Sequence, residues 1–273
     1  MNRMGDFLIQ NEGAVRIAAF AVILAGMAAL ELAMPKRPLS QKRPGRWFGN
    51  LAIVVIDTAV LRLLFFFLPA LAVGFAAAME AADIGLLNRT GLPYWAEFLI
   101  ALLVLDLAIY GQHVAFHHVP LLWRMHRVHH ADLDIDVTTG LRFHPAEIAL
   151  SMVLKLAVIA ALGAPAAAVL VFEIVLNGLA MFNHSNIDLP AWLDRPLRRL
   201  IVTPDVHRVH HSTIPQETNS NFGFNLSIWD RLFRTFRDQP EKGHLGMEIG
   251  LPEYRHGDRQ GLGWMILLPF RRT

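Results

Sequence analysis

The chain of 273 residues contains no cysteine, which excludes disulfide bonds, thiolate metal sites and iron–sulfur clusters. Charge is also scarce: charged residues make up 18% of the sequence and nearly cancel to a net charge of +2. So small a basic excess, interrupted by acidic residues, argues against nucleic acid as a partner. The glycine motifs of flavin and dinucleotide sites are missing as well, so redox chemistry would need electrons from a separate protein.

Apolar sequence is abundant. Hydrophobic residues make up 54% of the chain and the mean hydropathy is +0.38, which is unusual for a soluble protein. A bilayer core needs about 20 helical residues to cross it. The apolar runs of this order are residues 14–34, 47–67, 93–116, 146–162 and 166–182. The last two are short and flank a Gly-Ala-Pro break, so they predict either a re-entrant hairpin or two spans. We expect an all-α, multi-pass membrane helical bundle of about three spans plus a helical hairpin.

Basic residues predict the orientation of this bundle. Residues 35–46 hold five Lys and Arg and no acid, whereas residues 80–92 contain Glu80, Asp83 and Arg89. By the positive-inside rule, the first loop faces the cytoplasm. The histidine-rich segments that follow the later spans then return to the same side, as a cytoplasmic helical cap. In a bacterium this would be a multi-pass protein of the inner membrane.

Two charges inside the hairpin runs predict a contact. Lys155 and Glu173 each lie nine residues from Ala164, so a helical hairpin brings them to a similar depth. Because an unpaired charge there is costly, we expect the two side chains to pair or to share a polar cavity. The alternative is that Lys155 extends alone toward an interface.

Histidine carries the strongest functional signal. The sequence His-Arg-Val-His-His occurs twice, at residues 126–130 and 207–211, and a further cluster holds His113, His117 and His118. On a helix, the spacings i, i+3 and i+4 put three rings on one face, so each repeat is a candidate three-nitrogen metal site. Eight or more imidazoles indicate two metal ions, and imidazole suits iron, zinc and copper alike.

The residues around the repeats argue against two kinds of metal site, a hydrolytic zinc site and a haem site. Neither repeat contains the carboxylate base of a hydrolytic zinc site, and haem needs single axial histidines. Asp106, Tyr110, His113 and His117 form one helical stripe. We expect Asp106 to orient His113 by accepting its outer N–H, with a salt bridge to another helix as the alternative. Asp106 and Tyr110 are the candidate catalytic side chains, although Tyr110 is equally suited to packing.

The ordered motifs from about residue 95 to 236 resemble the fatty acid hydroxylase superfamily, also called the sterol desaturase family. The motifs that carry the resemblance are Asp106-(x3)-Tyr110-(x2)-His113-(x3)-His117, Leu122 to His130, Arg142-Phe143-His144-Pro145-(x1)-Glu147, His184 to Ile187, Thr203 to Ser212, Asn219 to Gly223 and Trp229 to Phe233. One departure is Arg234, where the family pattern has a glycine suited to a tight backbone turn.

The resemblance implies a non-haem di-iron centre, with zinc as a substitute occupant. The metal ligands that it implies are His113, His117, His126, His129, His130, His207, His210 and His211, with His184 and His144 as further candidates. The alternative for His144 is a bond to its neighbours Arg142 and Glu147, and His118 is expected to lie beside the ligands.

The function expected is that of a membrane-bound oxygenase. It would hydroxylate or desaturate a lipid-like or sterol-like substrate from the bilayer, using dioxygen and electrons from a separate donor protein. The expected division is N-terminal membrane helices at 1–92, a catalytic domain at 93–240 and a tail at 241–273. The alternatives are a zinc-dependent membrane hydrolase and a non-enzymatic metal-binding or transport protein.

Overall fold

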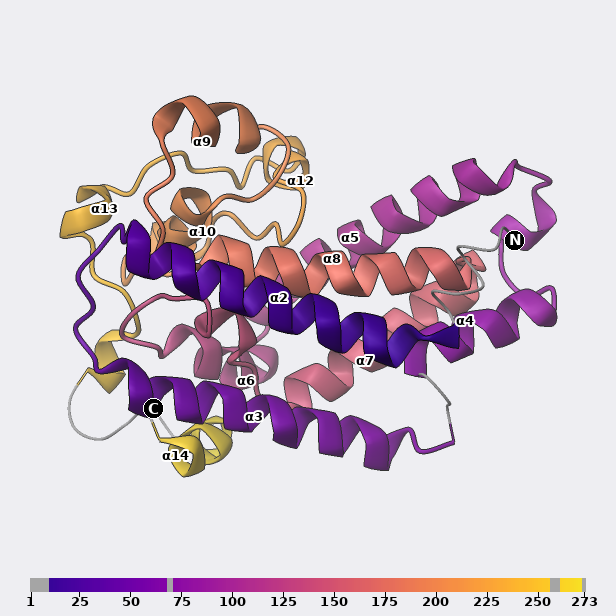
Figure 1. Cartoon of the computed structure of the whole chain (residues 1–273), viewed down its shortest axis with the longest axis horizontal. Helices are drawn as coiled ribbons and strands as arrows, with labels where there is room; N and C mark the ends of the chain where they lie inside the picture. Colours follow the sequence, from indigo (N-terminus) through magenta and orange to yellow (C-terminus); the bar gives the residue numbers. More distant parts are fainter. Residues whose placement is uncertain (1–9, 68–70, 256–260, 272–273) are drawn as a thin grey trace.

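The computed structural model describes residues 10–67, 71–255 and 261–271 (Figure 1). Across these ranges the fold is helical, and the only extended pairings are isolated bridges such as that between Pro35 and Ile187. Five helices are long and apolar enough to cross a membrane: α2 (Glu12–Ala33), α3 (Arg43–Leu64), α5 (Tyr94–His118), α7 (Pro145–Leu162) and α8 (Ala166–His184). The expected all-α membrane bundle is confirmed, and both hairpin helices are of spanning length.

Local sequence sets the ends of the hairpin helices. Pro145 begins α7, where its missing N–H is no loss, and Gly163 ends it with a φ of 69°. Pro165 then precedes α8, which runs to His184. Together with α4 (Leu71–Ala81) and α5, these helices bury an apolar core around Leu105, Ile159 and Phe172.

Apart from α4, the shorter helices gather at one end of the bundle, where α2 ends and α3 begins (Figure 1). They are α6 (Pro120–His130), α9 (Ala191–Leu197), α10 (Pro204–His210), α11 (Pro215–Thr218), α12 (Ile228–Leu232), α13 (Gly243–Gly246) and α14 (Leu262–Leu267). All the histidine-rich segments therefore arrive at the end that also carries the basic loop 35–46. That this end faces the cytoplasm stays a prediction.

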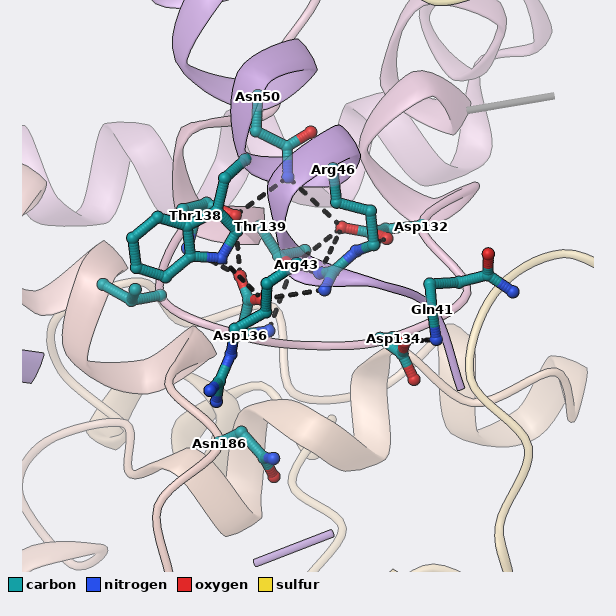
Figure 2. Close-up of polar contacts among 12 residues, drawn as sticks. Gln41, Arg43, Arg46, Asn50, Asp132, Asp134, Asp136, Thr138, Thr139 and Asn186 are labelled. Carbon is teal, nitrogen blue, oxygen red and sulfur yellow. Dashed lines mark hydrogen bonds and ion pairs between the residues drawn. The ribbon is translucent and has the colours of Figure 1, made fainter. Parts of the chain in front are cut away.

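A buried polar network joins α3 to the segment that follows α6 (Figure 2). Arg46 contacts Asp132 at 2.9 Å and Asp136 at 2.8 Å, and Asn50 donates to Thr138 at 3.0 Å. Burial disfavours the charge of Asp132, but the nearby Arg46 and Arg142 guanidiniums outweigh burial and lower the pKa of Asp132 to about 2. The loop that follows the first histidine repeat is thereby held against the start of α3.

The predicted hairpin contact is present. Lys155 Nζ lies 2.5 Å from Glu173 Oε1, so the pairing of these two charges across α7 and α8 is confirmed. Arg16 of α2 also reaches Glu173, at 2.9 Å. Glu173 thus joins three helices through two cations, which the hairpin argument did not anticipate.

Candidate metal centre

Nine of the thirteen histidines lie in two groups, within each of which the candidate ligand atoms are no more than 4.8 Å apart. The first group is His113, His117, His126, His130 and His210. The second group is His129, His184, His207 and His211. All are buried except the half-buried His117.

Four helices supply the two groups, and each histidine repeat divides between them. On α6, His126 and His130 join the first group while His129 joins the second. On α10, His210 joins the first group and His207 the second. The expectation that each repeat forms its own three-nitrogen site is wrong. Successive residues on a helix are about 100° apart, so neighbouring histidines point toward different centres.

Inward-facing ring nitrogens have the spacing of ligands that share an ion. The Nε2–Nε2 distance is 3.1 Å between His113 and His126, 3.0 Å between His129 and His184, and 2.9 Å between His184 and His207. Two nitrogens bound at about 2.1 Å and at right angles on one ion would be about 3.0 Å apart. The donor set therefore fits one metal ion in each group.

Hydrogen bonds at the outer nitrogens hold several rings in place. Nδ1 of His113 donates to the Phe222 carbonyl at 2.7 Å, and Nδ1 of His184 donates to the Ala180 carbonyl at 2.7 Å. His210 likewise donates to a backbone carbonyl. An N–H used in this way fixes the tautomer and leaves the Nε2 lone pair available to a metal.

Burial keeps these imidazoles neutral. Desolvation, followed by the neighbouring rings, lowers the pKa of His126, His129 and His211 well below its usual value near 6.5. Nε2 of His130 and Nε2 of His210 are buried and have no hydrogen-bond partner within the described part of the chain. Neutral, unpartnered ring nitrogens are the form that binds a metal ion, since the lone pair is not occupied by a proton.

His184 approaches the centre because the segment opposite it has no side chain. A Cβ at Gly140 would stand 2.5 Å from the Ala180 carbonyl oxygen and 3.2 Å from Nδ1 of His184. Glycine is therefore required where the loop containing Gly140 passes α8. The sequence gives no direct signal for this close approach.

Two sequence-predicted histidines lie apart from the groups. His144 belongs to neither: its Nδ1 accepts from the Ala146 amide and its Nε2 lies 3.1 Å from the Ile266 carbonyl. It thus serves as the N-terminal cap of α7. His118 is exposed and bonds the Val114 carbonyl of its own helix, in agreement with the expectation that it is only a neighbour.

Glu147 contacts the centre in a role that the sequence argument missed. Its Oε1 accepts a 2.7 Å hydrogen bond from Nδ1 of His126, whereas the sequence motif predicts Glu147 only as a partner of His144. Its place in the first turn of α7, within the motif that begins at Arg142, was the available signal.

Asp106 does not orient His113. Asp106 instead accepts from Nε1 of Trp229 at 2.8 Å and from the Leu226 amide at 3.3 Å, so the predicted contact is wrong. The outer nitrogen of His113 is already bonded to a backbone carbonyl, which leaves it no proton for Asp106. A salt bridge, the alternative, is not the observed contact either.

Tyr110, on the same helix as Asp106, also contacts the segment that follows α10. Its hydroxyl lies 2.9 Å from Oγ1 of Thr235, and its ring stacks on Phe233 at a centroid distance of 5.3 Å. Asp106 and Tyr110 together hold residues 226–235 against α5. These contacts place both side chains in packing and positioning, and a catalytic role for either stays a prediction.

A largely apolar cavity of about 290 Å³ adjoins the first histidine group. Residues of α3, α5, α7 and α8 line it, and it reaches His113 and His126. Phe116, Phe143 and Phe224 form aromatic walls. A hydrocarbon chain could therefore lie beside the histidines in largely apolar surroundings.

The sequence pattern of fatty acid hydroxylases matches residues 98–235, half of the chain and the segment that holds all nine clustered histidines. The chain belongs to the fatty acid hydroxylase family. Among its relatives is the ornithine lipid hydroxylase OlsE of Rhizobium tropici, 28% identical over 237 residues, which are 83% of this chain and 68% of that protein. No solved structure is significantly similar to the chain.

Two further relatives show more limited overlap. The alkylglycerol monooxygenase of Xenopus tropicalis is 30% identical over 161 residues, 56% of this chain and 32% of that protein. The cholesterol 25-hydroxylase of Rattus norvegicus is 29% identical over 153 residues, 55% of this chain and 50% of that protein. The chain thus spans about a third to a half of the length of these two relatives.

Arg234 departs from the family pattern at a strained position. Its φ is 62°, in the left-handed region that glycine adopts freely and an L side chain adopts at a cost. The expectation of a tight turn at this position is therefore confirmed. The turn follows α12 and leads to Thr235, the residue that contacts Tyr110.

Proposed function

We propose that this chain is a membrane-bound non-haem di-iron oxygenase that hydroxylates or desaturates a lipid-like substrate. The observation that carries the proposal is the convergence of nine imidazoles in two groups beside an apolar cavity. Membership of the fatty acid hydroxylase family supports it, as do relatives named as hydroxylases and monooxygenases. The catalytic part in this proposal is the segment 93–240, with 1–92 as its membrane helices and 241–273 as a tail.

The two histidine groups would each hold one ion. Neutral imidazoles add no negative charge, so the bound ions would keep their full positive charge, which suits the activation of dioxygen. Iron, when bound, would supply the oxidising chemistry needed to break an unactivated C–H bond, and zinc would not. The protein itself would orient the Nε2 lone pairs of the histidines. Phe222, Ala180 and Glu147 do this by accepting hydrogen bonds from the Nδ1 atoms of three of the rings.

The cavity would position the substrate. Its aromatic walls at Phe116 and Phe143 would pack against a hydrocarbon chain, and its border with His113 and His126 would bring that chain to the first group. Because the surrounding helices are of membrane-spanning length, a lipid could enter from the bilayer. Whether a second hydrogen is removed, to give desaturation, depends on which carbon lies nearest the histidines.

The electrons would come from a separate protein on the cytoplasmic side. The sequence contains no glycine motif of a flavin or dinucleotide site, so this chain would take its electrons from another protein. The basic loop 35–46 lies at the same end as the histidines, which favours the cytoplasm as the side from which the donor approaches.

Comparative lipid mass spectrometry tests this proposal. Membranes of cells that express the wild-type chain should contain a lipid that has gained one oxygen atom or lost two hydrogen atoms, only in the presence of dioxygen. His129→Ala should abolish the product, and His118→Ala, a neighbouring substitution outside both groups, should not. Ester or amide cleavage by a zinc-loaded protein without dioxygen would overturn the proposal in favour of a hydrolase, and metal uptake into vesicles without oxidation in favour of a transporter.

A further inference from the structure

We propose that the cavity beside His113 and His126 selects lipids that carry an ammonium group, and that the carboxylate of Asp57 is the residue that recognises it. This inference rests on the proposed function, since it names the class of substrate that the same cavity takes. It adds a specificity-determining residue on α3, outside the segment 98–235 that the family pattern matches.

The cavity is lined by hydrogen-bond acceptors that lack donors. Asp57 Oδ1, Gln112 Oε1 and Glu147 Oε2 are all buried, and none has a hydrogen-bond partner among the described residues. Asp57 is only 7% exposed and Glu147 only 3%. A buried acceptor without a donor is strongly unfavourable, so a bound molecule that supplies N–H groups would complete the site.

Elsewhere in the described part of the chain, buried carboxylates pair with cations or accept hydrogen bonds from N–H groups, as Asp106 and Asp230 do. Asp132 pairs with Arg46, and Glu173 pairs with both Lys155 and Arg16. The residues described around the cavity include no lysine or arginine. Because the protein supplies no cation to a cavity with two carboxylates, the ligand is expected to supply one.

The apolar walls determine what accompanies the ammonium group. Ile109, Phe116 and Leu141 line the same cavity as Asp57. These three side chains suit a hydrocarbon chain, and the polar groups that line the cavity, such as Thr58 and Ser151, lie beside them. An amine held at Asp57 therefore has its carbon chain in the space that also borders His113 and His126, where the proposed oxidation takes place.

The positive charge of bound metal ions is a competing explanation for the two acids. Glu147 bonds the outer nitrogen of His126, so its charge can act on an ion of the first group through that ring. Asp57 belongs to neither histidine group, and its Oδ1 has no hydrogen-bond partner in the described structure. A substitution at Asp57 can therefore show whether this acid recognises the substrate or balances the charge of a metal ion.

Ligand binding without turnover tests the inference. The full-length protein in detergent is titrated with dodecylamine and with dodecanol near neutral pH, and the ratio of their affinities is compared between variants, so that partitioning into micelles cancels. The ratio of the affinity for dodecylamine to that for dodecanol should be roughly tenfold higher in wild type than in Asp57→Asn. A charge-assisted hydrogen bond contributes about that factor to binding. Asp57→Glu should retain the preference, and so should Asp83→Asn, which removes an exposed acid that does not line the cavity.

Equal preference in wild type and Asp57→Asn would overturn the inference. Loss of iron from Asp57→Asn with the preference intact would also overturn it, because the acid would then balance metal charge. Failure of the proposed function is distinguishable from either result: it would show as absence of oxidised lipid from wild-type cells, whatever the affinity ratios.

Discussion

Glu147 accepts a 2.7 Å hydrogen bond from Nδ1 of His126, and both side chains are buried. This contact joins the first turn of α7 to the helix that carries the first histidine repeat. The outer nitrogens of His113, His184 and His210 bond backbone carbonyls, whereas Glu147 is a side-chain partner that a substitution can remove, as is Asn219 at a longer 3.3 Å from His117.

Glu147→Ala should weaken metal retention by roughly 10- to 100-fold, because His126 loses the bond that fixes its tautomer and orientation. Glu147→Gln should weaken it less, since the amide oxygen still accepts the N–H. Chelator competition, followed by iron analysis, measures the effect. Equal iron retention in wild type and Glu147→Ala would show that the contact does not support the ligand.

Lys155→Met should destabilise the protein by about 3 kcal/mol, because it leaves Glu173 buried with only Arg16 as a partner. The double variant with Glu173→Leu should recover most of that loss, since no buried charge remains and the half-exposed Arg16 can reach solvent. Thermal unfolding in detergent compares the three proteins. A double variant no more stable than Lys155→Met would contradict a buried ion pair at the hairpin.

Arg234→Gly should stabilise the chain by about 0.5–1 kcal/mol, because glycine adopts the φ of 62° at this turn without steric cost. Arg231→Gly is the comparison: it lies in α12, and its guanidinium donates to the Arg198 carbonyl and stacks on Phe236, so its loss should destabilise by at least about 1 kcal/mol. Urea unfolding gives both values. A loss of stability in Arg234→Gly would mean that the arginine side chain contributes more than its backbone strain costs.

Acidification should destabilise the metal-free protein. Burial, then neighbouring rings, lowers the pKa of His129, His207 and His211 well below 6.5. The unfolded chain therefore binds protons near pH 6.5 while the folded chain does not, so their contribution is complete above that pH and is lost as the pH falls. Each such imidazole adds a slope of about 1.4 kcal/mol per pH unit below its unfolded pKa. Unfolding curves of equal midpoint at about pH 7.5 and about pH 5.5 would contradict buried neutral imidazoles.

The sequence predicts the large elements of this fold well, because hydropathy and helix-breaking residues act locally. The run 146–162 becomes Pro145–Leu162, and the depth argument finds the contact between Lys155 and Glu173. The division of each repeat between two groups could also be predicted from the sequence, since helical geometry alone points the side chains of His129 and His130 in different directions.

The partners of the site residues depend on distant segments and could not be predicted in the same way. Asp106 and His113 share a helical stripe, yet the segment after α10 supplies a different partner to each, Trp229 and the Phe222 carbonyl. The network of Arg46 with Asp132 joins residues 86 positions apart through a fold that no local pattern specifies. His184 was expected only from the family motif, and the Gly140 approach that admits it has no sequence signature.

Metal analysis of protein purified without dioxygen tests the central claim most directly, with Mössbauer spectroscopy to show whether the iron atoms interact. The account predicts about two iron atoms per wild-type chain as a coupled pair, one ion for each histidine group. His118→Ala should keep both, and His129→Ala should lose the ion of the second group. Isolated single irons, or zinc as the retained metal, would contradict a di-iron centre built from the two groups.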